Sequence, residues 1–332
     1  MAGPYYVDVT TGDNGDTGLT EALAWADLGY AANQVAAGET VYVKASASYT
    51  ADDPDTATTN WEITTAGTST TPIIWIGYTS TITDGGVVTV DAQDTNTTAC
   101  LCMSGAVYNV FKNFRFSQAT GVGFSGASSN VATFINCRFD NNGSDGVNVA
   151  SQCSFEGCLS DNNAGMGFVV TYYSLFVACI ALSNTTNGFW LTSGSCFACI
   201  SAKNAGDWLF ACNSNYSFGM FNCVGDGDND ASQRGFEPRG DGYSIAIANC
   251  IFMDCNVGIT SGNDCGELVI SRNNLFYSNG TDRTSWKAGE GDVAGSSDPF
   301  TDSANDDYSL KSGSEAIDTG YDASQPVSDW GL

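Results

Sequence analysis

Four carboxylates in one Gly- and Asp-rich segment have a spacing that could bind calcium. The segment runs from Gly225 to Gly242. Its acids occupy positions 1, 3, 5 and 12 of a calcium-loop pattern: Asp226, Asp228, Asp230 and Glu237. The match is partial, because position 6 is Ala231 rather than Gly. The segment therefore predicts either a calcium site or an ordinary solvated turn, since Asp, Asn and Gly are also common turn residues.

Two arginines and a further acid in this segment are the candidate catalytic residues. They are Arg234, Arg239 and Asp241. A guanidinium beside acids can clamp a substrate carboxylate, or it can simply form an ion pair across a turn. The chain contains no His, which excludes a Ser-His-Asp triad and removes the commonest general base.

The elements that would position this segment are indicated by a repeat. Six residues recur at intervals of 20 to 24 residues: Phe114, Cys137, Cys158, Cys179, Cys199 and Cys223. A period in this range is typical of a repeat architecture. The interval then lengthens to 27 residues between Cys223 and Cys250. We therefore expect about six residues of the acidic segment to protrude as a loop, where solenoids often carry function.

Two further columns accompany the first. The second column is an Asn that lies five positions after a residue of the first column: Asn142, Asn163, Asn184, Asn204 and Asn279. The third column is a large apolar residue that lies nine or ten positions after a residue of the first column: Phe124, Val147, Phe168, Phe189, Trp208 and Ile259. No unit contains a helix-length periodic segment. The pattern predicts an all-β, single-stranded parallel β-helix with inward Phe and Cys stacks and an inward Asn ladder, in which Asn also suits the left-handed corners.

Both ends of the chain resemble known capping segments. Tyr6 to Thr20, Gly38 to Val43 and Thr70 to Tyr78, together with the closing Asp298 to Gly320, resemble right-handed parallel β-helix proteins of the pectate-lyase-like superfamily. The resemblance implies one domain, with a cap at 1–40, coils at 41–280 and a closing segment at 281–332.

One amphipathic segment is expected to be helical and to cover the open N-terminal end of the core. It runs from Leu19 to Val35. Its apolar face is expected to comprise Ala22, Leu23, Ala26, Tyr30 and Ala31.

The resemblance is specific for the fold and much less so for function, because this scaffold carries lyases, hydrolases, epimerases and viral adhesins alike. Lyases of the superfamily usually pair acidic calcium ligands with an Arg or Lys base. The resemblance therefore implies that, in a lyase, Arg234 or Arg239 takes the proton next to the substrate carboxylate. Superfamily hydrolases use clustered Asp residues on adjacent coils. Asp140 and Asp161 stack in this way, but each adjoins a turn Asn and is interpreted as turn chemistry.

Composition narrows the partners. The 37 acidic and 11 basic residues give a formal net charge of −26. This balance argues against nucleic acid and, unless cations intervene, against an anionic polysaccharide as the binding partner.

The 13 Cys are expected to be mostly reduced and structural. No apolar stretch is long enough to span a membrane. The sequence does not open with a basic segment and an apolar core, so we expect export by another route, such as assembly into a virion.

Two function classes fit the sequence. The first is a non-enzymatic structural or adhesive rod, such as a phage capsid decoration, fibre or spike protein, located in the virion and contacting other virion proteins or a host-surface glycan. The second is an extracellular carbohydrate-active enzyme, a polysaccharide lyase or glycoside hydrolase. The first is favoured because the repeats carry only scattered carboxylates. No cofactor is required in either case, calcium is optional, and a homo-oligomer is compatible with both.

Overall fold

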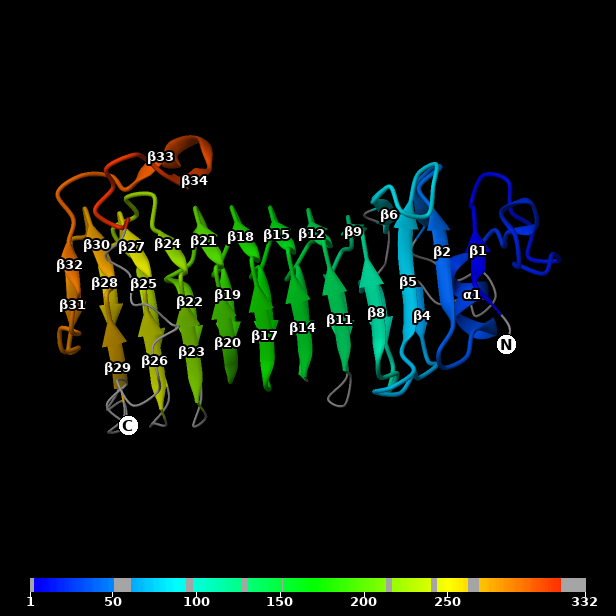
Figure 1. Ribbon diagram of the computed structural model, residues 1–332, viewed down its shortest axis with the longest axis horizontal. Coiled ribbons are helices and arrows are strands. Elements are labelled where there is room, and N and C mark those ends of the chain that lie inside the picture. Colours follow the sequence, from blue (N-terminus) through cyan, green and yellow to red (C-terminus); the bar gives the residue numbers. More distant parts are fainter. Residues whose placement is uncertain are drawn as a thin grey trace.

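The computed structural model is an elongated rod of stacked coils (Figure 1). It describes residues 3–50, 61–93, 98–126, 131–150, 152–212, 217–239, 244–261 and 269–317. Each coil visits three parallel sheets in turn, which we call sheets 1, 2 and 3; they contain 11, 11 and 10 strands. Within each of these sheets, every strand between the two end strands pairs with the strands one coil before and after it. The predicted all-β parallel solenoid is confirmed.

The strands are short and succeed one another in a fixed order. Sheet 1 contains β1 (Tyr5–Val7), β2 (Thr40–Lys44), β5 (Ile73–Tyr78), β8 (Asn109–Lys112), β11 (Ala132–Ile135), β14 (Cys153–Glu156), β17 (Ser174–Val177), β20 (Gly194–Phe197), β23 (Phe218–Phe221), β26 (Ile245–Ala248) and β29 (Val269–Arg272). Sheet 2 contains β3 (Tyr49–Thr50), β6 (Val88–Asp91), β9 (Phe114–Ser117), β12 (Arg138–Asp140), β15 (Leu159–Asp161), β18 (Ile180–Leu182), β21 (Ile200–Ala202), β24 (Val224–Asp226), β27 (Ile251–Met253), β30 (Leu275–Tyr277) and β32 (Val293–Ala294). Sheet 3 contains β4 (Trp61–Ile63), β7 (Ala99–Met103), β10 (Val122–Gly126), β13 (Val147–Val149), β16 (Phe168–Val170), β19 (Phe189–Leu191), β22 (Trp208–Cys212), β25 (Arg234–Pro238), β28 (Val257–Thr260) and β31 (Thr281–Thr284).

The core consists of vertical stacks, as the columns predict. Phe134 and Phe155 stack with ring centroids 5.3 Å apart, and Phe168 and Phe189 stack at 5.0 Å. These distances are close to the ~4.8 Å spacing of strands, because identical residues on successive coils lie directly above one another. The column cysteines are buried, unpaired as disulfides, and immediately precede strands that are in register: Cys137, Cys158, Cys179, Cys199 and Cys223. The predicted inward thiol stack is confirmed.

The Asn column is a buried ladder of amide hydrogen bonds. The side-chain amide of Asn142 donates to Oδ1 of Asn163 at 2.9 Å, and Asn163 donates to Asn184 at the same distance. Asn163, Asn184 and Asn204 also accept a bond from the backbone N–H of the Asn one coil before. One detail of the prediction is wrong: the left-handed corner residues, such as Asn141 and Asn162, are one position before the ladder Asn.

The predicted helix is only half formed. The segment Leu19 to Val35 contains a 3₁₀ turn, η1 (Glu21–Leu23), and one α-helix, α1 (Leu28–Gln34). Trp25 interrupts it, because its backbone pairs with β1 and holds the chain extended. Asp27 then caps α1 by accepting the N–H of Tyr30 at 2.8 Å. The buried face therefore differs from the predicted one, with Ala31 in common: Leu28, Gly29, Ala31 and Ala32.

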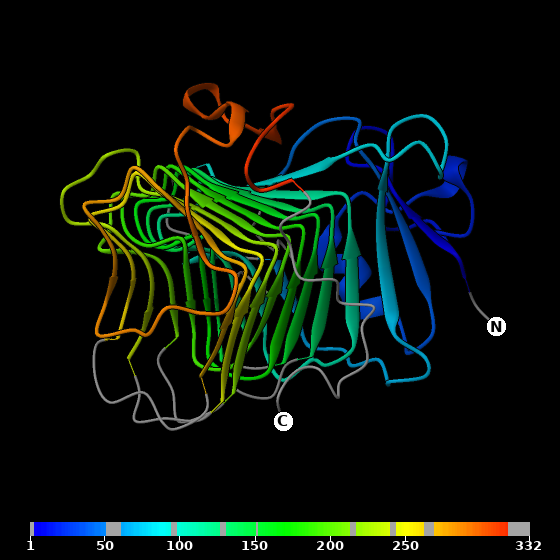
Figure 2. The ribbon, with the colours of Figure 1, turned by 60° about the vertical axis from the view of Figure 1, so that its left-hand side comes forward.

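The closing segment folds back along the rod. It forms an antiparallel hairpin of β33 (Phe300–Asp302) and β34 (Asp307–Leu310), with a 3₁₀ turn, η2 (Ser303–Asn305), between them. Figure 2 shows the hairpin lying over the outer face of sheet 2. Phe300 packs there against Val224 and Ile251. The hairpin thus covers an apolar part of this face.

Candidate functional site

The acidic segment does not protrude as one loop. Its residues Arg234–Pro238 form β25, an ordinary strand of sheet 3. Most of the additional coil length follows this strand, since residues 239–244 separate β25 from β26, whereas only residues 192 and 193 separate β19 from β20. A strand therefore forms inside the acidic segment, and the expected protruding loop stays a prediction, because residues 240–243 lie outside the described residues.

This arrangement separates the four predicted calcium ligands. Asp226 ends β24 in sheet 2, whereas Glu237 lies in β25 of sheet 3. Asp230 is exposed and accepts hydrogen bonds from Ser232. Throughout the described ranges, no group of three or more Asp, Glu or Cys side chains is placed to hold a metal ion. The chain's geometry does not bring these four carboxylates to one ion.

Asp226 instead anchors the C-terminal hairpin. Its Oδ2 accepts the hydroxyl of Tyr308 at 2.8 Å, and its Oδ1 accepts the N–H of Asp228 at 2.9 Å. Burial raises the pKa of Asp226, which these hydrogen bonds only partly oppose. Lys203 adds a second attachment by donating to the carbonyl of Ala304 at 2.7 Å. The acid at position 1 of the pattern is thus a structural group beneath the hairpin.

The last acid of the calcium-loop pattern, Glu237, contacts three N–H groups on the outer face of sheet 3. Its Oε2 accepts the indole N–H of Trp208 at 2.7 Å and a guanidinium N–H of Arg234 at 2.9 Å. Its Oε1 lies 3.3 Å from Nε of Arg239. Two of the three candidate catalytic residues therefore meet at one carboxylate, while the third, Asp241, lies outside the described residues.

Two tryptophans complete this group. The guanidinium carbon of Arg239 lies 4.3 Å from the ring centroid of Trp208 and 5.6 Å from that of Trp190. The two indoles meet edge to face at 5.6 Å, and both are half-buried. Charge and quadrupole attraction favour this stacking. We call these five residues the Trp–Arg cluster: Trp190, Trp208, Arg234, Glu237 and Arg239.

Strand alternation explains why Glu237 faces outward. Phe236 points into the core and stacks on Phe218 at 5.5 Å, so its neighbour Glu237 points to the opposite face. In the same outward row, Ala211 lies between Trp190 and Glu237. Because Ala is small, it leaves room for the longer side chains to converge above it.

Two of these residues were missed or misplaced in the sequence. Trp208 was expected in the inward aromatic column, but Phe210 occupies that register position, between Phe189 and Phe236. Trp190 could have been found by alternation, because it directly follows the inward Phe189. The error at Trp208 arises because the inward residue of this coil, Phe210, lies 11 residues after Cys199 and not nine or ten.

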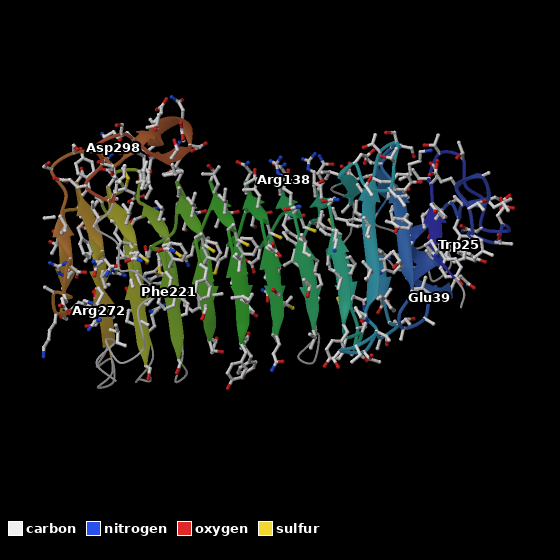
Figure 3. The ribbon with its side chains drawn as sticks, viewed as in Figure 1. Trp25, Glu39, Arg138, Phe221, Arg272 and Asp298 are labelled. Atoms are coloured by element: carbon white, nitrogen blue, oxygen red, sulfur yellow. The ribbon has the colours of Figure 1, made fainter. Side chains whose placement is uncertain are left out.

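A second charged group lies on sheet 2, near the edge of the rod where Figure 3 labels Arg138. Arg115 donates two hydrogen bonds to Asp140, at 2.8 and 2.6 Å. Arg138 does the same to Asp161, at 2.8 and 2.7 Å. Asp140 and Asp161 stack on one corner as expected. Their interpretation as turn residues is incomplete, because each also forms an ion pair with an arginine. Both carboxylates are occupied by these fork-like pairs.

The fold has relatives among solved structures. Residues 73–205 match the family model described as "Right handed beta helix region". The structure resembles "pectate lyase Pel9A", with a TM-score of 0.67 and 17% identity over 97% of this chain and 92% of that one. The fold is a right-handed parallel β-helix of the pectate-lyase-like type. It also resembles a "Rhamnogalacturonan lyase", with a TM-score of 0.51 and 14% identity over 87% and 84% of the two chains. No curated protein has a matching sequence.

Proposed function

We propose that this protein is a carbohydrate-active enzyme that binds a polysaccharide across the outer face of sheet 3. The observation that carries the proposal is the Trp–Arg cluster, in which two half-buried indoles and two partly exposed guanidiniums surround one buried carboxylate. Aromatic faces suit the apolar C–H faces of sugar rings, and fixed polar groups beside them suit hydroxyl and carboxylate groups. The two structural relatives are a pectate lyase and a rhamnogalacturonan lyase, which agrees with this choice.

The cluster favours elimination over hydrolysis. Hydrolysis of a glycosidic bond needs a pair of carboxylates flanking the bond, whereas the cluster contains one, Glu237, which is already engaged by Trp208, Arg234 and Arg239. Elimination needs a cation to neutralise the carboxylate next to the proton that is removed. Two guanidiniums can supply this charge without a metal ion.

The expected role of Arg234 or Arg239 as the proton-abstracting base is not favoured by this geometry. A guanidinium loses its proton only with great difficulty, and both guanidiniums already contact the Glu237 carboxylate. We therefore assign both arginines to clamping the substrate, and the base to a residue outside the cluster.

The non-enzymatic rod stays the second candidate. The observation in its favour is that the cluster, as it lies in the described part of the chain, lacks a base. In that case the same face binds a glycan without cleaving it. The virion location, the virion partners and a homo-oligomer remain predictions from the sequence.

The test is glycan binding followed by turnover. Purified protein is titrated with neutral and acidic oligosaccharides by calorimetry and tryptophan fluorescence, and binders are then assayed for unsaturated products and for new reducing ends. Trp190→Ala is expected to weaken binding by about tenfold or more, as for a buried aromatic contact. The matched control is Phe197→Ala, an aromatic residue that is 38% exposed on the outer face of sheet 1.

The outcomes separate the two candidates. Unsaturated products that disappear in Trp190→Ala support an eliminating enzyme, while binding without products supports the rod. If no glycan binds, or if both variants bind like the wild type, the proposed site is wrong.

A further inference from the structure

The Trp–Arg cluster has more positive than negative charge. Each of the other four arginines has a carboxylate of its own, in the pairs Arg115–Asp140, Arg138–Asp161, Arg272–Glu290 and Arg283–Asp292. Arg234 and Arg239 instead share Glu237. Within the described residues, the cluster therefore has a formal charge of about +1, on a chain whose net charge is −26.

The positive groups are also the ones that meet solvent. The side chains of Arg234 and Arg239 are 37% and 38% exposed, whereas that of Glu237 is 7% exposed. Each guanidinium directs one nitrogen at Glu237 and has further N–H donors. A ligand approaching this face meets two cationic donors beside two indoles, with the carboxylate behind them.

The rest of the molecule opposes a densely charged ligand. The excess of acids repels any polyanion. At physiological salt the screening length is about 8 Å, so a charge within the cluster is attracted, while charges a few sugars away interact mainly with the acidic surroundings. No cluster of acids in the described ranges is placed to bind cations that would relieve this repulsion.

We infer that the Trp–Arg cluster selects a glycan that carries an isolated anionic group on an otherwise uncharged stretch of sugars. This inference rests on the proposed function and specifies the ligand. The anionic group is a carboxylate or a sulfate ester, since both present paired oxygens that match a guanidinium. The neighbouring uncharged sugars contact Trp190 and Trp208.

The experiment compares four oligosaccharides of equal length by calorimetry: one neutral, one with a single uronate, one with a single sulfate, and one composed only of uronates. Titrations are made at about 50 mM and about 300 mM NaCl, because salt weakens both the local attraction and the long-range repulsion. The singly charged ligands are expected to bind about tenfold more tightly than the neutral one, and more tightly than the polyuronate at low salt. The uronate and sulfate arms identify which anionic group is preferred.

Three variants locate the effect. Arg239→Gln is expected to abolish the preference for a single charge. Glu237→Gln removes the negative charge of the cluster and is expected to strengthen the preference for a singly charged ligand. Lys112→Gln changes the net charge as much as Arg239→Gln does, but on the outer face of β8, and is expected to have no effect.

The outcomes distinguish this inference from the proposed function. If the neutral ligand binds as well as the singly charged ones, or if the polyuronate binds best at low salt, the inference is wrong while binding at the site stands. If Lys112→Gln matches Arg239→Gln, the effect is one of net charge and the inference is wrong. If none of the four ligands binds, the proposed function itself fails.

Discussion

Replacing one rung of the Asn ladder tests whether the coils are held together by buried amides. Asn163 is 1% exposed. Its amide donates to Asn184 Oδ1 and to the carbonyl of Phe139, at 2.9 and 3.0 Å. Its Oδ1 accepts both the backbone and the side-chain N–H groups of Asn142, at 3.1 and 2.9 Å. Its amide also donates to Ser160 Oγ at 3.2 Å, so Asn163→Ala removes five buried hydrogen bonds.

The magnitude follows from those groups. A buried polar group that loses its partner costs roughly 1 to 3 kcal/mol. The backbone N–H of Asn142 loses its acceptor, while the Asn142 amide keeps its bond to the carbonyl of Phe116 and Asn184 Oδ1 keeps its bond from the Asn163 backbone. We expect a loss of about 3 kcal/mol in the free energy of unfolding, lower if water enters the gap.

The assay is urea unfolding followed by circular dichroism and tryptophan fluorescence together, because a solenoid can lose its coils in separate steps. The matched control is Asn148→Ala, in which an exposed Asn on the outer face of β13 is removed. Its expected effect is within about 0.5 kcal/mol, as is usual at the surface. Equal midpoints for the two variants would show that the ladder contributes nothing, and the reasoning would fail.

Three further outcomes are expected. Phe168→Ala, at a fully buried position stacked on Phe189, is expected to cost about 3 to 5 kcal/mol in urea unfolding; a loss below 1 kcal/mol would mean that the aromatic stack is not the core. Asp226→Asn keeps an acceptor for Tyr308 but removes a buried charge. Because the folded state raises the pKa of Asp226, the wild type becomes more stable as pH falls, so the variant is expected to melt higher at pH 7 and equal to the wild type below about pH 4; a lower melting temperature at pH 7 would contradict this. A thiol reagent is expected to label the half-buried Cys102 before any of the other described cysteines, which are buried; early loss of a column thiol in mass spectrometry would contradict the inward stack.

The inward half of the fold was predictable because a β-helix converts sequence period into vertical contact. A residue and its counterpart one coil later become neighbours wherever the interval is constant, so Cys158 and Asn163 could be placed from spacing alone. The corner residues were predicted one position too late, because the left-handed residue Asn162 directly precedes the ladder residue Asn163.

The outward half was less predictable, since its contacts depend on side-chain reach and not on period. Arg138 reaches Asp161 on the next coil, and Trp208 reaches Glu237, although neither pair shares a column position. The C-terminal hairpin is outside the repeat altogether, so no spacing could show that Tyr308 covers Asp226. The Ca²⁺ pattern failed for a related reason: a strand within the acidic segment carries its last acid to another sheet.

The same departure from regularity explains where the candidate site lies. In the three coils before the site the strands of sheet 3, β13, β16 and β19, contain three residues, whereas β22 and β25 contain five. The residues added at the start of these two strands, Trp208 and Arg234, lie directly opposite each other in the register. Lengthening adjacent strands by the same amount keeps the core stack in register and adds these two facing positions. The indole and the guanidinium that occupy these positions both bind Glu237, so the change in coil length itself assembles the cluster.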